Sequence, residues 1–300
     1  LVDAQLPITK KHIHRKELLQ LVNYFNSRDR SRLILSSENI QDVEVYSLDS
    51  YKELFYGLLV PNTSYLELFE LKKYRNGILL RYPHISQPDE MPPYEDQKLL
   101  YDAFSEATLW ERLMGVSYVA DLNEKIKNND YQDLIMLQEA LHEKKISDIA
   151  DQIKQENKRI ILICGPSSSG KTSFAKRLCI QMRVIGLKPL YLGTDDYFVE
   201  RSETVLDENG EKDYESIQAV DIELFNKQIN DLLNGQKVDL PTFDFINGTK
   251  IFGQRIVSID KNQPIVIEGI HALNQILTKD INDNEKFKIY ISPLTSLNID

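Results

Sequence analysis

A glycine-rich segment near the middle of the chain carries residue types that bind phosphate. Residues 165–172 read Gly-Pro-Ser-Ser-Ser-Gly-Lys-Thr, which fits the pattern G-x-x-x-x-G-K-[ST] of a phosphate-binding loop. Its glycines let the backbone wrap, so that successive N–H groups converge on phosphate oxygens at a helix N-terminus. Lys171 can reach the β- and γ-phosphates and act in catalysis by compensating charge there, and the Thr172 hydroxyl can bind Mg²⁺. The predicted nucleotide-binding residues are Gly165, Ser167, Ser168, Ser169, Gly170, Lys171, Thr172 and Ser173.

Carboxylates that could serve phosphoryl transfer follow two other apolar runs. Asp195 and Asp196 come directly after Leu-Tyr-Leu-Gly-Thr, and Glu268 ends the run Pro-Ile-Val-Ile-Glu. An open α/β sheet places its site at the carboxyl ends of its strands. Asp195 is expected to accept a proton from a substrate hydroxyl, and Glu268 to bind Mg²⁺. For Asp196, a functional role and a role in capping a turn both stay open.

The nucleotide is expected to be ATP. A switch GTPase would carry the guanine-reading string Asn-Lys-x-Asp. The nearest string here, Asn-Lys-Gln-Ile at residues 226–229, lacks the aspartate and lies inside a predicted helix. ATP and Mg²⁺ are therefore the predicted cofactors.

The elements that would position these residues alternate between strands and helices. Residues 159–164 form a short apolar run, which is typical of a strand buried on both faces of a parallel sheet. Residues 173–186 read as a helix closed by Gly186, and Asp221 is expected to cap a helix that ends at Gly235. The alternation predicts an α/β fold, a parallel sheet of the P-loop NTPase type with flanking helices.

The first half of the chain predicts a smaller α+β module and a helical connector. Residues 15–26 place apolar side chains at helical spacing, and residues 67–83 read as a hairpin around the turn pair Asn76-Gly77. The proline-containing segment 83–97 reads as a linker. Two helical patterns follow, at about 96–114 and 131–157.

Several spaced segments of the second half resemble the uridine kinase branch of the phosphoribulokinase/uridine kinase family. In family order they are GPSSSGKTSFAKRL, DDYF, ESIQAVDIELF, LPTFDF and IVIEGIHAL. The similarity covers residues 158–300. It implies ATP-dependent phosphorylation of the 5′-hydroxyl of a pyrimidine ribonucleoside, a reaction of nucleoside salvage. It also implies Asp195 as the general base and Thr172 and Glu268 as the Mg²⁺ positions.

The same resemblance implies an acceptor pocket. Glu215 falls where the family has an aspartate on the ribose hydroxyls, and Phe243 and Phe245 fall where aromatic residues hold the base. Tyr197 and Phe198 stand where the family usually has Phe-Tyr, so the order of the two aromatic residues is reversed. All five side chains are expected to contact the nucleoside.

The N-terminal part resembles a different module. Residues 50–74 are similar to the segment before the kinase core in bacterial nucleoside kinases that carry a threonyl-tRNA-synthetase-like N-terminal region. We therefore predict a partial module of that kind at 1–90 and a linker with helical connector at 91–157. The P-loop kinase core is predicted at 158–300, with the family's arginine-bearing C-terminal lid missing.

Composition narrows the expected partners and location. The formal net charge of −10 argues against binding nucleic acid by bulk electrostatics, and no apolar run is long enough to span a membrane. Cys164 and Cys179 form no disulfide framework and no metal-ligand spacing, which is typical of reduced thiols in a cytoplasmic protein. The expected partners are ATP and a nucleoside, and homo-oligomerisation stays open.

Two other functions stay open alongside the nucleoside kinase. A phosphoribulokinase-like or pantothenate-kinase-like enzyme would share the loop and the base but differ in the acceptor pocket. A nucleotide-sensing, RNA-binding regulatory protein would need no proton acceptor, so Asp195 and Glu268 favour an enzyme. Glu215 and the PTFDF segment favour a ribose and a base over a phosphosugar, which would require several arginines.

Overall fold

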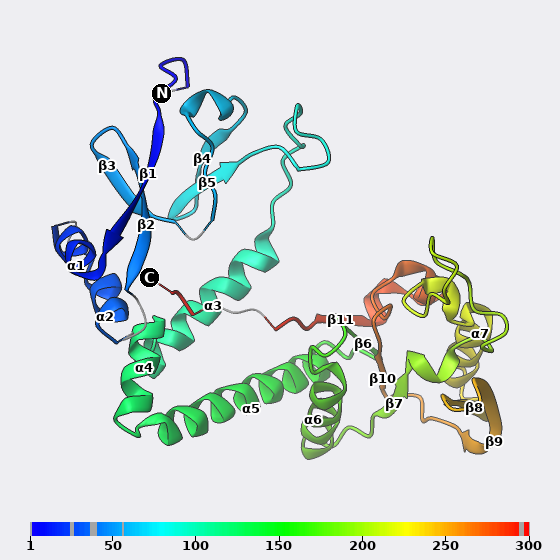
Figure 1. Cartoon of the computed structure of the whole chain (residues 1–300). Coiled ribbons are helices and arrows are strands. Elements are labelled where there is room, and N and C mark those ends of the chain that lie inside the picture. The colour runs from blue at the N-terminus through cyan, green and yellow to red at the C-terminus, as the bar shows by residue number, and fades with distance from the viewer. Residues whose placement is uncertain (1, 25–26, 37–40, 56, 294–296, 300) are drawn as a thin grey trace. The chain divides into compact units, whose positions relative to one another are not determined.

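The computed structural model describes residues 2–24, 27–36, 41–55, 57–293 and 297–299. The chain separates into two compact units. They can be followed by residue number in Figure 1, where the colour runs from blue at the N-terminus to red at the C-terminus. The first unit comprises Leu1–Ile135 and Ser296–Asp300, and the second comprises Met136–Thr295. The predicted division at residues 90 and 157 stays a prediction.

The first unit is built on an antiparallel sheet packed against helices. Its strands lie in the order β1 (Ile8–His14), β2 (Asp42–Leu48), β3 (Tyr51–Leu54). Helices α1 (Arg15–Tyr24) and α2 (Arg28–Ser36) follow β1. The shared core consists of Ile13, Leu18, Val22, Ile34 and Val45. The helix predicted over residues 15–26 is thus confirmed for residues 15–24, and residues 25–26 lie outside the described part of the chain.

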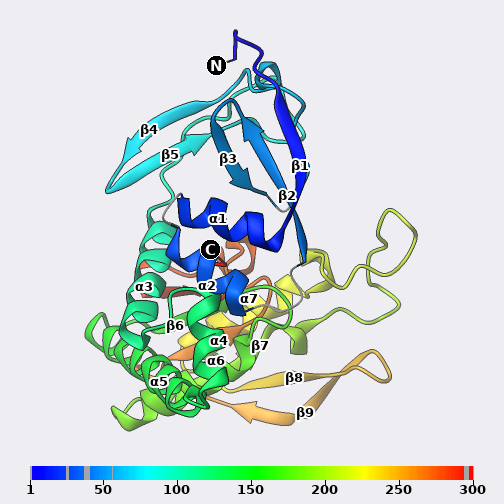
Figure 2. The same cartoon turned by 60° about the vertical axis from the view of Figure 1, so that its left-hand side comes forward.

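A separate hairpin, β4 (Glu70–Tyr74) with β5 (Gly77–Arg81), belongs to the same unit and is clear in Figure 2. Tyr74 pairs with Gly77, so the turn consists of Arg75 and Asn76, one residue before the predicted pair. Arg75 has a left-handed φ of 51°. Its guanidinium lies 4.3 Å from the centre of the Tyr101 ring, and this contact favours a conformation that arginine rarely adopts.

Three helices lie within the range predicted as linker and connector: α3 (Lys98–Met114), α4 (Val119–Lys127) and α5 (Tyr131–Gln155). The helical patterns at 96–114 and 131–157 are confirmed, whereas α4 was not predicted. Asp121 caps α4 by accepting hydrogen bonds from the backbone N–H groups of Ser117 and Tyr118, at 3.0 and 2.9 Å. Arg32 of α2 donates to Asp121 at 2.7 Å, which ties α2 to α4.

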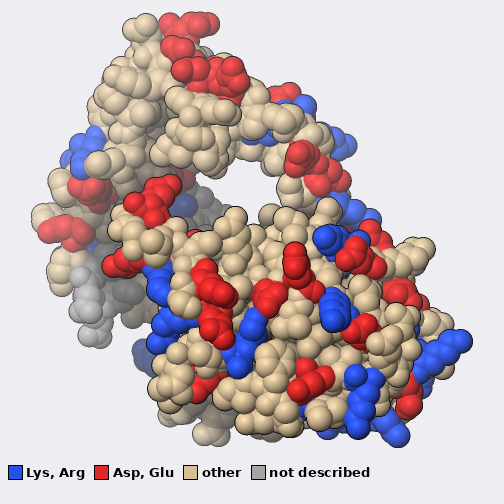
Figure 3. Space-filling model, turned by 90° about the vertical axis from the view of Figure 1, so that its right-hand side faces the viewer, with Lys and Arg blue, Asp and Glu red and all other residues tan. Residues whose placement is uncertain are grey.

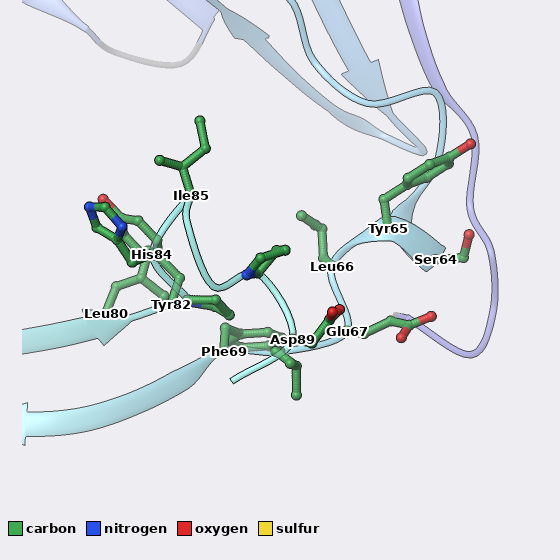
Figure 4. A pocket seen from close by; sticks show the side chains of 13 residues that line it. Ser64, Tyr65, Leu66, Glu67, Phe69, Leu80, Tyr82, His84, Ile85 and Asp89 are labelled. Atoms are coloured by element: carbon green, nitrogen blue, oxygen red, sulfur yellow. The ribbon is translucent and has the colours of Figure 1, made fainter. Parts of the chain in front are cut away.

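A hollow in the first unit has a volume of about 860 Å³ and is shown in Figure 4. It lies between the segment that precedes β4 and the segment that follows β5. Its lining residues are Ser64, Tyr65, Leu66, Glu67, Leu68, Phe69, Leu80, Tyr82, Pro83, His84, Ile85, Pro88 and Asp89. This hollow contains none of the site residues predicted from the sequence.

The second unit is a three-layer α/β domain, as predicted. Its parallel sheet has the strand order β11 (Lys286–Tyr290), β6 (Ile160–Cys164), β10 (Ile265–Glu268), β7 (Leu190–Gly193). One face packs on α6 (Lys171–Val184) and the C-terminal part of α5, through Ile161, Ile163 and Val266. The other face packs on α7 (Ile222–Leu233) through Leu162 and Ile267.

Outside this sheet, β8 (Val238–Asp244) and β9 (Thr249–Val257) form an antiparallel hairpin. The predicted cap is confirmed, because Asp221 accepts a hydrogen bond from the N–H of Leu224 at 3.1 Å at the start of α7. Short 3₁₀ turns lie at Thr63–Tyr65, Thr194–Tyr197, Ile217–Ala219, Gln275–Thr278 and Asp283–Glu285. The turn Thr194–Tyr197 carries the predicted base.

The charged side chains are intermixed on the face shown in Figure 3, where Lys and Arg alternate with Asp and Glu. Neither sign dominates that face. In the described part of the chain, no helix combines the length and apolarity needed to cross a membrane.

Candidate active site

The phosphate loop joins the end of β6 to the start of α6, as its motif requires. A Cβ atom on Gly165 would lie 2.1 Å from the carbonyl oxygen of Ile291, so only glycine fits there. Gly170 has a φ of 87° and Ser168 a φ of 60°, both in the left-handed region. These conformations turn the chain sharply into α6, the shape needed for a loop that wraps around phosphate.

The N-terminus of α6 presents unpaired backbone donors. The first hydrogen bond within the helix runs from the N–H of Phe174 to the carbonyl oxygen of Gly170, at 2.9 Å. The N–H groups of Lys171, Thr172 and Ser173 therefore precede the helical ladder. Together with the positive end of the helix dipole they can bind an anion.

Lys171 reaches back across this loop. Its side chain is almost buried, and its ammonium donates a hydrogen bond to the carbonyl oxygen of Pro166 at 2.8 Å. Ser167 and Ser168 are exposed on the same loop, whereas the Ser169 hydroxyl oxygen is buried. The charged group thus lies on the loop whose backbone would bind the phosphates.

Thr172 and Glu268 meet at the carboxyl edge of the sheet. The Thr172 hydroxyl donates to Glu268 Oε2 at 3.2 Å, and the Tyr191 hydroxyl donates to the same oxygen at 3.0 Å. They meet because β10 lies between β6 and β7, with Glu268 level with Ile163 and Gly193. Tyr191 was not predicted as a site residue, although a hydroxyl in a buried strand indicates that a polar partner is near.

Within the described part of the chain, no group of three or more His, Cys, Asp and Glu side chains is placed to hold a metal ion. The pair Thr172 and Glu268 nevertheless fits Mg²⁺, because both are hard oxygen ligands beside the phosphate loop. Mg²⁺ in phosphoryl-transfer sites is bound by one or two carboxylates and by the substrate phosphates, rather than by an all-protein cage.

Asp195 is the second residue of the turn Thr194–Tyr197 after β7 and remains accessible to solvent. The pKa of its carboxyl is raised above the ordinary value, first because neighbouring atoms partly remove it from water and then because the Glu268 carboxylate repels its charge. The Lys171 ammonium acts in the opposite direction. Asp195, Glu268 and Lys171 are therefore close enough to interact electrostatically.

Asp196, whose role the sequence left open, binds the β8–β9 hairpin. Its Oδ1 accepts a hydrogen bond from the backbone N–H of Phe243 at 3.4 Å, and its Oδ2 accepts one from Arg255 at 2.8 Å. Arg255 was missed by sequence reasoning, because its partner lies far away along the chain. Both oxygens of Asp196 are engaged in holding structure.

Three of the predicted acceptor residues form one aromatic cluster. The ring centres of Phe243 and Phe245 are 5.1 Å apart, and Phe198 lies 5.8 Å from Phe243 and 6.4 Å from Phe245. Phe243 is buried, whereas Phe245 is 58% exposed. The cluster thus includes one accessible aromatic side chain, that of Phe245.

The other two predicted acceptor residues, Tyr197 and Glu215, are not part of this cluster. Tyr197 is 1% exposed, and its hydroxyl donates to Gln228 at 2.9 Å, so its side chain is part of the core. We therefore do not retain Tyr197 as a substrate contact. Glu215 lies on an exposed loop, where its backbone N–H donates to Asp213 at 2.9 Å. That loop leaves and rejoins the fold beside the cluster, because Phe198 pairs with Val220.

Residues 160–300 match the model of the Phosphoribulokinase / Uridine kinase family. The uridine kinase of Staphylococcus haemolyticus (strain JCSC1435) is 32% identical over 143 residues, which cover 48% of this chain and 66% of that protein. The uridine kinase of Ligilactobacillus salivarius (strain UCC118) is 30% identical over 134 residues, which cover 44% and 61%. The phosphate loop, Asp195 and Glu268 all lie within the residues that match the family.

A solved structure described as "Structure of a Possible Uridine Kinase from Bacillus stearothermophilus" is 24% identical, with a TM-score of 0.41. The similarity covers 49% of this chain and 79% of that one. The chain spans 61% to 66% of the length of the two uridine kinases above.

Proposed function

We propose that the second unit transfers the γ-phosphoryl group of ATP to the 5′-hydroxyl of a pyrimidine ribonucleoside. The observation that carries the proposal is the meeting of three groups at one edge of the sheet. The phosphate loop ends in Lys171 and Thr172, Glu268 bonds to Thr172, and Asp195 follows the next strand. A proton acceptor beside a phosphate-binding loop is what phosphoryl transfer to a hydroxyl needs.

In the proposed reaction, Asp195 accepts the proton of the 5′-hydroxyl. The freed oxygen forms a bond to the γ-phosphorus while the bond to the β–γ bridging oxygen breaks, and ADP leaves with that electron pair. Lys171 neutralises negative charge as it shifts toward the leaving oxygen. The raised pKa of Asp195 makes it a stronger base than an ordinary aspartate.

Thr172 and Glu268 would hold Mg²⁺ through their hydroxyl and carboxylate oxygens. When bound, the ion supplies charge neutralisation and orientation to the phosphates. The chain's own contribution is to fix the Glu268 carboxylate, which the hydroxyls of Thr172 and Tyr191 do.

The pyrimidine specificity is supported by the relatives and by the aromatic cluster. Both relatives named above are uridine kinases. The exposed side chain of Phe245 beside Phe198 and Phe243 can pack against a planar base. Glu215 is proposed to accept hydrogen bonds from the ribose hydroxyls, since its loop is anchored beside Phe198.

An acceptor panel tests this proposal. ADP release is measured with ATP, Mg²⁺ and each of uridine, cytidine, thymidine, adenosine, ribulose 5-phosphate and pantothenate. We expect release with uridine or cytidine, and loss of at least about 100-fold in the Lys171→Ala variant. ADP release with ribulose 5-phosphate or pantothenate, and with none of the nucleosides, would show that the acceptor is not a nucleoside. Binding of ATP without release for any acceptor would contradict a kinase.

A further inference from the structure

The β8–β9 hairpin carries Phe243 and Phe245 but is not hydrogen-bonded into the parallel sheet. Its position relative to Asp195 therefore depends on contacts outside the sheet ladder, which include the bond from the Arg201 N–H to the carbonyl oxygen of Gly248 at 2.9 Å and several side-chain contacts. The residue next to the proposed base makes two of them. One carboxylate oxygen of Asp196 accepts a hydrogen bond from the backbone N–H of Phe243, and the other accepts one from the guanidinium of Arg255.

Arg255 of β9 makes a second bond to the strand that ends at the site. Besides donating to Asp196 at 2.8 Å, its other terminal nitrogen donates to the carbonyl oxygen of Tyr191 at 3.2 Å. The planar guanidinium can make both bonds at once, whereas a lysine ammonium has no such fork. Both strands of the hairpin are thus joined to β7 and the turn that follows it.

The ion pair is partly shielded from water. The Asp196 side chain is 25% exposed and that of Arg255 32%. Such a pair is stronger than a fully exposed one, because solvent screens it less. Its main effect here is on geometry, since it joins a β-hairpin to the turn Thr194–Tyr197, which contains Asp195.

We propose that Arg255 and Asp196 are positioning residues that fix the aromatic wall of the acceptor pocket relative to the general base. The proposal rests on the proposed kinase function. Phe198 directly follows the same turn, and its backbone N–H donates to the carbonyl oxygen of Asp195 at 3.4 Å. The Asp196 carboxylate thus joins the hairpin side of the cluster to the turn that carries Asp195.

The proposal predicts a split between the two substrates. Breaking the pair with Arg255→Met or Asp196→Asn should raise the KM for the nucleoside roughly 5- to 30-fold while the KM for ATP stays within about twofold. The nucleoside KM of the double variant should be no higher than that of the more impaired single variant, since both changes remove the same ion pair. Arg255→Lys should be intermediate, because it keeps the charge but loses one of the two bonds.

Arg177→Met is the matched control. Arg177 forms an ion pair with Glu143 on the helical face of the same unit, away from the proposed machinery. Its removal should leave both KM values unchanged. An equal rise in the ATP and nucleoside KM values for Arg255→Met, or no change in either for Arg255→Met and Arg255→Lys, would overturn the proposal.

A readout without turnover separates this proposal from the proposed function. Amide hydrogen exchange of Phe243, followed by NMR, reports its bond to Asp196. Exchange should be at least about tenfold faster in Arg255→Met, with the amides of α6 unchanged. Unchanged exchange at Phe243 would overturn the positioning role. If the exchange changes as expected but no nucleoside is phosphorylated by the unaltered protein, the proposed function fails and the structural role of the pair stands.

Discussion

At the scale of single residues, the site depends on how the Glu268 carboxylate is held. Its Oε2 accepts hydrogen bonds from two hydroxyls, Thr172 at 3.2 Å and Tyr191 at 3.0 Å. Glu268 is itself 9% exposed, so each donor matters more than it would in water. The pKa of Tyr191 is raised, first by burial and then by the neighbouring Glu268 charge, which keeps the phenol protonated as a donor.

Tyr191→Phe removes one of these donors and little else. We expect the Mg²⁺ concentration for half-maximal binding of a fluorescent ADP to rise about tenfold or more, as for other residues that orient a metal-binding carboxylate. Binding without Mg²⁺ should not change. Tyr290→Phe, on an exposed position of the same sheet, is the control. An unchanged Mg²⁺ dependence would show that Tyr191 only fills space.

Glu215→Gln tests the proposed ribose contact. A carboxylate can accept both the 2′- and 3′-hydroxyl protons, and each charge-assisted bond contributes roughly 1.5–3 kcal/mol. The specificity constant should therefore favour uridine over deoxyuridine by about 10- to 200-fold, and the substitution should erase much of that preference. Glu211→Gln, on the same exposed loop, serves as control. A ratio that is the same in all three proteins would remove Glu215 from the acceptor site.

At the scale of elements, strands and helices with a periodic or fully apolar pattern could be predicted, and contacts between distant segments could not. The apolar run at 159–164 became β6, and the loop after it turns into α6 as the motif requires. Helix α4 was missed because its N-cap position is Tyr118, which is not a residue type typical of caps. Arg255 was missed because nothing near it in the sequence indicates Asp196.

The turn of the β4–β5 hairpin shows the same limit. Local preference favours Asn-Gly at a tight turn, yet Arg75 occupies the left-handed position. Its guanidinium lies near the rings of Tyr74 and Tyr101 and donates to Asp102 at 3.0 Å. Tertiary contacts with α3 outweigh the local preference, and no sequence pattern within the hairpin encodes them.

Close backbone packing at the phosphate loop gives a prediction for the element. In Gly165→Ala, the new Cβ would lie 2.1 Å from the carbonyl oxygen of Ile291, so the backbone must move. We expect the free energy of unfolding to fall by about 1–3 kcal/mol or more, with loss of ADP binding. Gly193→Ala provides the comparison for stability, because a Cβ there meets nothing within 4 Å. Equal stability of the two variants would contradict this packing.

At the scale of the whole molecule, the two compact units can be followed separately. Trp110, the single tryptophan in the sequence, lies in α3 of the first unit, whereas ADP binding reports on the second. In the first unit, Asp121 both caps α4 and pairs with Arg32. Burial raises the pKa of Asp121, but the bonds from Arg32, Ser117 and Tyr118 outweigh this and hold the pKa below its ordinary value.

Asp121→Ala should lower the stability seen by Trp110 fluorescence by about 1–2 kcal/mol, because it removes the carboxylate that completes the capping box of α4 and pairs with Arg32. The loss in unfolding free energy should be complete at pH values above the ordinary pKa of an aspartate. It should vanish as the pH falls through the lowered pKa of Asp121 in the folded protein, because protonation ends the favourable interaction. ADP affinity should not change. Asp130→Ala, an exposed acid in the turn after α4, is the control. A deficit that persists at low pH would contradict the assigned ion pair.

The central claim, phosphoryl transfer to a nucleoside by a base at residue 195, is tested most directly with Asp195→Asn. The amide keeps the shape of the side chain but cannot accept the hydroxyl proton. ATP affinity and the formation of ADP and uridine 5′-monophosphate are measured in parallel. We predict that the unaltered protein forms the two products in equal amounts, and that Asp195→Asn lowers turnover by ~10²–10⁴-fold with ATP affinity nearly unchanged. Turnover that survives at saturating ATP while ATP affinity collapses would contradict the account, because Asp195 would then serve nucleotide binding instead of proton transfer.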